Sequence, residues 1–212
     1  MEQILKQYSL INHLNVSRET ILDFENFITM IKEKNRQINI ISKESCKNNI
    51  IRERHLIDSA QVIDFIDLNK NTTTDLGTGG GFPGIVLAIM LKNTKKKIKI
   101  NLYEKSHHKS VFLREVSRKL NLDTEVIQND IFGTTELKTG TIIARAFKPL
   151  PVVLELVYKN FISYKNLILF MGKSGKEILE ETLKVWDLDF EQRKSITSED
   201  SFLLNIKKIN KK

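Results

Sequence analysis

Ten residues in the first half of the chain, Asp75 to Gly84 (DLGTGGGFPG), combine an acid, a proline and five of the chain's nine glycines. Glycine has no Cβ, so it allows positive φ and lets a ligand approach the backbone closely. The segment follows a run that suits a strand and leads into one that suits a helix, whose first N–H groups can bind polar or anionic groups. These residues predict a cofactor site. A tight turn without a ligand is the alternative.

The glycines fit two ligand-binding patterns. Gly79, Gly81 and Gly84 satisfy G-x-G-x-x-G, which is typical of dinucleotide-binding enzymes. Asp75, Gly77, Gly79 and Gly81 satisfy [D/E]-x-G-x-G-x-G, which resembles the first motif of S-adenosylmethionine-dependent methyltransferases. A carboxylate at Asp75 can accept a hydrogen bond from the ammonium group of that cofactor, directly or through water. The second pattern is therefore favoured, and an NAD(P)-dependent oxidoreductase is the alternative.

Other charged residues have spacings or positions that suit chemistry. Glu104 ends the next expected strand, where an acid commonly holds a ribose diol. Arg145 stands at the carboxyl end of a later strand. Arg54 and Asp58 are four residues apart and share a helix face, so Asp58 can orient Arg54 towards RNA or face a purine. A simple surface pair is the alternative, and His55 taken alone favours a structural role. No histidine spacing indicates a metal site.

The elements that must position these residues alternate between strand and helix after a helical N-terminal third. Expected strands are 73–76, 98–103, 124–127, 141–145, 167–171 and 202–209. Expected helices are 17–31, 49–65, 84–91, 106–120, 150–161 and 176–185. This alternation predicts an α/β fold of Rossmann-like methyltransferase type, with a mostly parallel sheet and an antiparallel last strand. We expect one methyltransferase domain over residues 1–212, with an N-terminal helical cap (1–70) and a cofactor-binding core (71–212).

Composition narrows the partners and the compartment. The 212 residues carry 34 Lys and Arg against 26 Asp and Glu, a net charge of +8 that favours an anionic partner such as nucleic acid. Cys46 is the only cysteine, which suits a reducing compartment. The first ten residues have no signal-peptide pattern, and no apolar run approaches the roughly 20 residues of a membrane span. We expect a cytoplasmic protein without membrane association.

Three segments in order, RHLIDS (54–59), DLGTGGGFPG and ARAF (144–147), are together similar to the RsmG (GidB) family. That family uses S-adenosylmethionine to methylate N7 of a guanosine in small-subunit ribosomal RNA. The resemblance extends from about Asn39 to Lys173, which is most of the chain. It implies cofactor contacts at Gly77, Phe82, Ile131, Phe132 and Arg145, in addition to the loop residues and Glu104. It also implies catalytic roles for Arg54, His55, Asp58 and Arg145.

The chain departs from the family pattern in places. Ala144 stands where the family often has serine, and Met171-Gly172-Lys173 replaces the usual Leu-Lys-Gly, so no role is assigned to Lys173. Guanine N7 already carries an in-plane lone pair, so its methylation requires alignment rather than a general base. The sequence thus predicts a 16S rRNA guanine-N7 methyltransferase that uses S-adenosylmethionine. Its expected partner is small-subunit ribosomal RNA or a ribosomal particle, and we expect a monomer.

Overall fold

The computed structural model of the chain describes residues 16–46, 50–94 and 97–212. Its helical segments are α3 (Arg18–Asn35), η1 (Ile51–Ile57), α5 (Asp58–Ala60), η2 (Gln61–Phe65), α6 (Gly84–Leu91), α7 (His107–Lys119), η3 (Ile131–Gly133), α8 (Leu150–Asn160) and α9 (Gly175–Leu183). Its strands are β1 (Thr72–Leu76), β2 (Lys99–Tyr103), β3 (Thr124–Ile127), β4 (Leu137–Lys138), β5 (Thr141–Ala144), β6 (Phe161–Ser163), β7 (Asn166–Met171), β8 (Trp186–Lys194) and β9 (Phe202–Lys211).

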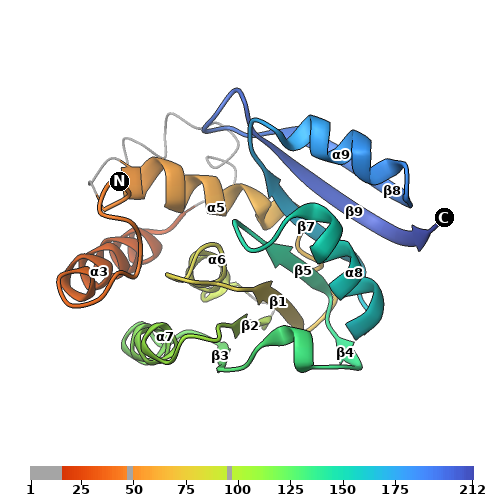
Figure 1. Cartoon of the computed structure of the whole chain (residues 1–212). Helices are drawn as coiled ribbons and strands as arrows, with labels where there is room; N and C mark the ends of the chain where they lie inside the picture. Colours follow the sequence, from red (N-terminus) through yellow and green to blue (C-terminus); the bar gives the residue numbers. More distant parts are fainter. Residues whose placement is uncertain (1–15, 47–49, 95–96) are drawn as a thin grey trace.

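In the described part of the chain, seven strands form one sheet in the order β3-β2-β1-β5-β7-β9-β8, and β4 pairs with β6 beside it (Figure 1). The first five strands of that order are parallel, and β9 is antiparallel to both β7 and β8. This confirms the expected mostly parallel sheet with an antiparallel last strand. The chain order reverses between β1 and β5, and ligands of open α/β sheets bind beyond the carboxyl ends of strands at such a point.

Strand β8 was not predicted from the sequence. Trp186, Leu188 and Phe190 alternate as a strand requires, but Asp187, Asp189, Glu191, Arg193 and Lys194 stand among them. The strand lies at the edge of the sheet, where charged side chains are common because they discourage further pairing. Hydrophobicity alone is therefore a weak signal for it.

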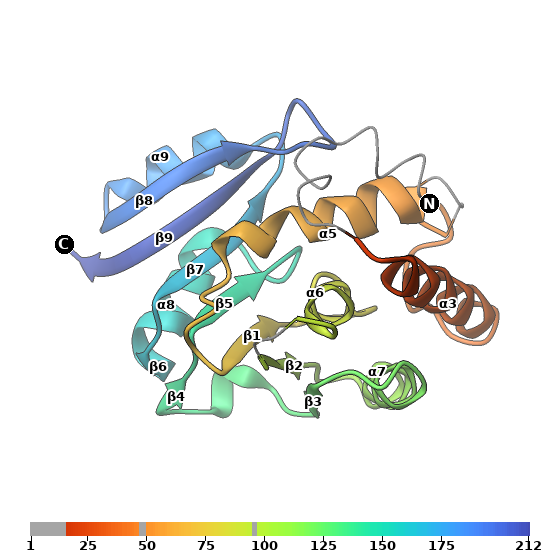
Figure 2. The ribbon, with the colours of Figure 1, turned by 180° about the vertical axis from the view of Figure 1, so that it is seen from behind.

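Two hydrophobic cores cover the two faces of the sheet. Side chains of α3, η1, α6 and α7 form one core, and side chains of α8 and α9 contribute to the other. Helix α6 (GIVLAIML) is apolar all round, and its side chains except Met90 are buried. A helix of this kind must be covered on every side, and α3 and the segment from η1 to η2 cover it away from the sheet (Figure 2).

Local capping and ion pairs to the core hold the described part of the expected cap in place. The hydroxyl of Ser17 accepts a hydrogen bond from the backbone N–H of Thr20 at 3.1 Å, as expected of an N-cap. Asp23 of α3 pairs with Lys92, just after α6, at 2.9 Å. Residues 1–15 of the expected cap, and Asn49 at the expected start of its second helix, lie outside the described residues.

Candidate functional site

A cavity of about 480 Å³ opens beyond the carboxyl ends of the central parallel strands. This volume is within the range of small-molecule sites, roughly 300–1,000 Å³. Seven of the residues expected to contact a cofactor line it: Gly77, Gly79, Phe82, Glu104, Ile131, Phe132 and Arg145. His55 also lines it, whereas Asp75, Gly81, Arg54 and Asp58 do not.

Part of the glycine loop is packed against a side chain of the protein itself, whereas the sequence suggested that the whole loop is open to a ligand. Gly77 has φ +65°, and a Cβ built on it would lie 2.3 Å from the ring of Phe147. Gly79 differs, because at φ +58° a Cβ on it would meet no atom closer than the Gly77 carbonyl oxygen at 3.8 Å. Gly79 therefore combines a left-handed backbone with space that a ligand can occupy.

The other two glycines of the G-x-G-x-x-G spacing face the protein interior. A Cβ on Gly81 would lie 2.7 Å from Ile85, and one on Gly84 would lie 2.2 Å from Leu102. Close helix–strand packing is the expected task of the third glycine of a dinucleotide fingerprint, but the second glycine should leave its backbone open to a pyrophosphate. Gly81 is instead covered, which argues against the nicotinamide alternative.

Asp75 lies beneath the loop rather than in the cavity wall. It is fully buried, and its Oδ2 accepts a hydrogen bond from the Gly84 N–H at 2.9 Å, at the start of α6. Its Oδ1 is buried without a hydrogen-bond partner. Burial is the main reason that the pKa of Asp75 is raised to about 6. This places Asp75 one layer behind the ligand space, where it orients the loop and the helix start.

Glu104 lines the cavity at the end of β2. Its Oε2 accepts from the Gly79 N–H at 3.0 Å and its Oε1 from the Ser106 N–H at 2.7 Å. The Ser110 hydroxyl donates to the Glu104 carbonyl at 3.0 Å, so both backbone and side chain are fixed. A carboxylate has about four acceptor positions, and these two bonds leave capacity for a pair of hydroxyl groups.

The Ile131–Phe132 pair follows β3, as expected, and begins the 3-10 turn η3. Asp130 caps this turn, with its Oδ1 accepting from the Phe132 N–H at 3.2 Å. The Phe132 ring stacks near the Phe147 ring, with centroids 6.0 Å apart and planes 25° apart. Asp130 and Phe147 line the cavity too. Sequence reasoning assigned them no individual role, although Asp130 directly precedes Ile131 and Phe147 lies two residues after Arg145 in the ARAF segment.

The RHLIDS segment is helical, but its first part is wound as the π-helix η1. Such windings are rare and frequently occur at functional sites. The His55 ring lies over the Phe82 ring, with centroids 5.0 Å apart, and its Nε2 is buried without a partner. Burial, together with Arg145 and Arg54, lowers the pKa of His55 to about 4. The imidazole is therefore neutral at pH 7.

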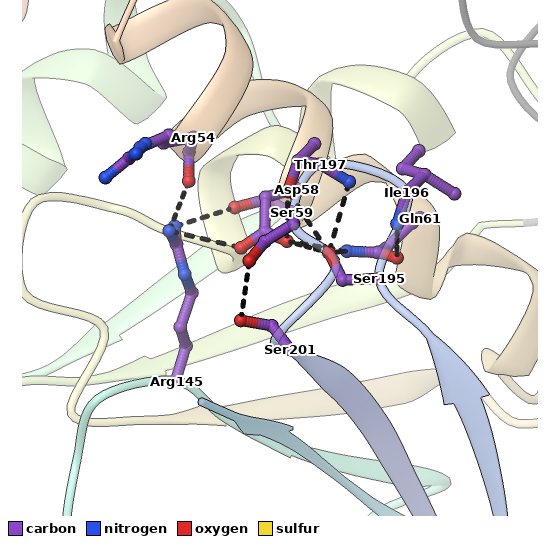
Figure 3. Close-up of polar contacts among 10 residues, drawn as sticks. Arg54, Asp58, Ser59, Gln61, Arg145, Ser195, Ile196, Thr197 and Ser201 are labelled. Carbon is purple, nitrogen blue, oxygen red and sulfur yellow. Dashed lines mark hydrogen bonds and ion pairs between the residues drawn. The ribbon is translucent and has the colours of Figure 1, made fainter. Parts of the chain in front are cut away.

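Arg145 and Asp58 form the centre of a polar cluster at the other side of the cavity (Figure 3). Arg145 Nη2 lies 3.2 Å from Asp58 Oδ2 and also donates to the carbonyl oxygen of Arg54, while Nη1 donates to the Ser59 hydroxyl at 3.4 Å. The expectation that Asp58 orients the side chain of Arg54 is therefore wrong. The two residues are four positions apart on the helix, but the Arg145 guanidinium lies between the Arg54 carbonyl oxygen and the Asp58 carboxylate, and the Arg54 side chain is exposed.

Asp58 is also held by the loop between β8 and β9. Its Oδ1 accepts from Thr197 Oγ1 at 3.0 Å, from Ser195 Oγ at 3.2 Å and from Gln61 Nε2 at 2.6 Å. We call Asp58, Gln61, Arg145, Ser195 and Thr197 the Asp58 cluster. It joins α5 and η2 of the cap, the end of β5 and the β8–β9 loop (Figure 3).

The two loop residues of this cluster were missed by sequence reasoning. Ser195 and Thr197 lie 137 and 139 residues from Asp58 in the chain. A segment reading KSITSEDS gives no local sign of a carboxylate partner. The carboxylate of Asp58 is thus hydrogen-bonded by the protein itself and does not line the cavity.

Residues 20–203 match the family model described as GidB, rRNA small subunit methyltransferase G. The chain is 65% identical over 212 residues to a protein of Pelagibacter ubique (strain HTCC1062) named Ribosomal RNA small subunit methyltransferase G, covering 100% of both. It is 32% identical over 196 residues to a protein of the same name from Ruegeria pomeroyi, covering 92% of this chain and 94% of that one.

Solved structures support the fold. A SAM-dependent methyltransferase from Aquifex aeolicus superimposes with a TM-score of 0.55 at 16% identity, covering 82% of this chain and 97% of that one. The 16S rRNA methylase RmtB gives a TM-score of 0.53 at 10% identity, covering 86% of this chain and 74% of that one. At such identities the likeness concerns the fold alone.

Proposed function

The chain belongs to the GidB family of ribosomal RNA small subunit methyltransferases G, and from this premise we propose that it transfers a methyl group from S-adenosylmethionine to N7 of a guanosine in 16S ribosomal RNA. The observation that carries the proposal is the 480 Å³ cavity at the switch point of the sheet. Unfilled hydrogen-bonding groups and an open glycine converge there. The nicotinamide alternative has no comparable support.

On the cofactor side, each proposed role uses a group that the protein leaves available. Glu104 would hold the ribose diol through its remaining acceptor positions. Because Gly79 has no side chain, the cofactor would contact the backbone there. Ile131 and Phe132 would form the wall beside the adenosine. Phe82, stacked under His55, would form the opposite wall. Gly77, Gly81 and Asp75 would act indirectly, by shaping the loop.

The chemistry requires alignment more than proton transfer. S-adenosylmethionine supplies an electrophilic methyl group on a sulfonium centre, and guanine N7 offers its lone pair without losing a proton. Positive charge passes to the purine as the new N–C bond forms and the C–S bond breaks. Holding donor and acceptor in line is therefore the main task of the protein.

The charges around the cavity suit a cationic reacting centre. Asp58 compensates the guanidinium of Arg145, and a pKa of about 4 keeps His55 uncharged at neutral pH. Two potential cations thus add little repulsion to the sulfonium or to the methylated purine. We propose that Arg145 and His55 position ligands in the wall and that Asp58 acts through Arg145, with none of the three serving as a general base.

Cations at the cavity and beside it would hold the RNA backbone. Lys105, Lys109 and Lys148 line the cavity, and Arg54 is exposed next to His55. Among the described residues, these four take part in no ion pair. Phosphate contacts of this kind make affinity fall steeply with salt.

We also propose one methyltransferase domain, with residues 1–70 as cap and 71–212 as core, acting as a monomer in the cytoplasm. The shared hydrophobic core of cap and sheet supports a single domain. None of the helices in the described residues is long and apolar enough to cross a membrane.

The deciding experiment is methyl transfer from labelled S-adenosylmethionine to small-subunit ribosomal RNA, offered naked and as an assembled particle. We expect label in the RNA and 7-methylguanosine at one position after digestion. Mapping that base in cells with and without the protein would identify the position. Label on another base, or none on either substrate, would refute the proposed function.

A further inference from the structure

A second cavity, of about 280 Å³, adjoins the first and shares Ala146, Phe147 and Lys148 with it. Its other walls include Leu150, at the start of α8, and Phe170 of β7. We propose that this second cavity receives the acceptor guanine, turned out of the RNA, and that Phe147 and Phe170 are the residues that hold its ring. The inference rests on the proposed function and adds the binding site of the base.

The position of the second cavity suits a base edge. Strand β5 ends at Ala144, which pairs with Leu169, whereas β7 continues to Met171. Phe170 and Met171 pair with β9 on one side and have no partner from β5 on the other. Backbone groups at this edge can therefore meet the hydrogen-bonding edge of a purine, and ligands of such sheets bind at the carboxyl ends of their strands.

Two aromatic residues supply faces for a flat ring. Enzymes that modify a base commonly turn it out of its stack and hold it between aromatic or apolar side chains. Phe170 lines the second cavity and not the first, and the Arg145 guanidinium carbon lies 5.5 Å from its ring centre. Leu150 and Leu169 complete an apolar wall around it.

Phe147 forms part of the partition between the two cavities. Its ring packs on Gly77 of the cofactor loop, so it stands directly beside the proposed cofactor space. The preceding residue, Ala146, has φ +49°, a left-handed conformation that costs a non-glycine residue energy and is concentrated at ligand sites. This turn carries Phe147 back towards Gly77, so a base in the second cavity would have its reactive edge near the first.

Lys148 supplies a counter-charge for the turned-out nucleotide. It is exposed and lines both cavities. A cation at their common mouth can bind the phosphate next to the flipped base, a contact that positions RNA without reading its sequence. By contrast, the apolar groove around Ile178 and Trp186 shares no residue with the cofactor cavity.

A matched pair of variants separates the two cavities. Phe170→Leu changes a residue of the second cavity only, and Phe132→Leu changes a residue of the first only. We expect Phe170→Leu to lower kcat/KM for the RNA by about 5- to 150-fold, the loss of one base–aromatic stack, with the Kd of S-adenosylmethionine within twofold of wild type. Phe132→Leu should raise that Kd instead, and Phe170→Tyr should retain activity.

A second measurement locates the base directly. Ribosomal RNA substituted with 6-thioguanosine is photo-crosslinked to the wild-type protein in the presence of S-adenosylhomocysteine, and the modified peptide is identified by mass spectrometry. We expect crosslinks at 146–148 or 170–171. Crosslinks at the Ile178–Trp186 groove, unchanged RNA kinetics in Phe170→Leu, or a cofactor Kd that moves with it would overturn the assignment. A wild-type protein that methylates no RNA would instead refute the proposed function itself.

Discussion

Glu104 and Asp58 are carboxylates in two regions that the sequence marked as functional, and the fold uses them in opposite ways. Glu104 accepts two backbone N–H groups and keeps acceptor positions towards the cavity. Asp58 is filled by Arg145, Gln61, Ser195 and Thr197 and does not line the cavity. Polar groups with unused hydrogen-bonding capacity indicate where a ligand binds. Polar groups whose hydrogen bonds are all made within the protein indicate what fixes the geometry of the site.

The same contrast holds for the cations and the glycines. Arg145 is compensated inside the Asp58 cluster, while Lys105 and Lys148 remain available at the cavity. Gly77 is covered by an aromatic ring, while Gly79 is open. We therefore treat the glycine loop with Glu104 as the binding wall and the Asp58 cluster as its support. The following predictions test this division, from the largest expected effect to the smallest.

Gly79→Val tests the binding wall and should have the largest effect. A branched side chain at φ +58° is strained and would project into open space, so we expect the Kd of S-adenosylmethionine to rise about 100-fold or more while the chain stays folded. Calorimetry gives the Kd and circular dichroism the fold. Gly172→Val is the matched control, because a Cβ there meets nothing within 4 Å and the backbone is not left-handed. Unchanged affinity in Gly79→Val would remove this loop from the site.

Asp58→Asn tests the support. The substitution leaves the mostly buried guanidinium of Arg145 uncompensated, and losing one partner of a buried pair costs up to about 3–5 kcal/mol. We expect the free energy of unfolding to fall by about 3 kcal/mol, at the low end of that range because the pair is partly exposed. Turnover should fall as well, without a change in the shape of the pH–rate profile. Full activity in a destabilised variant would separate the cluster from catalysis.

The pH dependence of stability has opposite signs for two buried groups beside the binding wall, Asp75 and His55. Asp75 has a folded pKa of about 6, above the ordinary value of 3.8 for an aspartate, so the folded state binds the extra proton and this contribution to stability is lost as pH rises from about 4 to about 6. His55 has a folded pKa of about 4, below 6.5, so its contribution is gained as pH rises from about 4 to about 6.5. The two slopes should largely cancel in the wild type.

Asp75→Asn removes one of these slopes and exposes the other. Relative to the wild type, we expect the free energy of unfolding of the variant to rise by about 1.4 kcal/mol per pH unit at most between pH 4 and 6, and to level off above pH 6. Urea unfolding at half-unit pH intervals measures it. A difference that is constant with pH would contradict the raised pKa of Asp75.

Thr197→Val should have the smallest effect. It removes one hydroxyl donor to Asp58 and keeps the shape of the side chain, a loss of about 1.5–3 kcal/mol for a hydrogen bond to a charged group and less where Ser195 compensates. We expect a several-fold lower kcat with a small change in cofactor Kd, and recovery in Thr197→Ser. Ser198→Ala, in the same loop but exposed and bonded to Ser201 rather than to Asp58, is the control. Equal effects of the two substitutions would show only loop damage.

The sequence determined the parts of this protein that depend on local spacing. Alternating strands and helices, the loop from Asp75 to Gly84 and the position of Glu104 after β2 were all predicted, because periodicity and backbone chemistry act between residues close in the chain. The family signature added His55 and Arg145, and both line the cavity. Their chemical roles stay predictions.

Only the tertiary structure decided which groups remain available to a ligand. Asp58 meets Arg145 and Thr197 rather than its helical neighbour Arg54, and Gly77 meets Phe147, 70 positions along the chain. The charge-rich segment 186–194 forms strand β8 because its backbone pairs with that of β9. A helix or loop pattern fixes the backbone position of a residue. Desolvation and packing between distant segments decide which partner its side chain contacts. That is why the sequence could name the carboxylates but could not say that Asp75 and Asp58, unlike Glu104, lie outside the cavity wall.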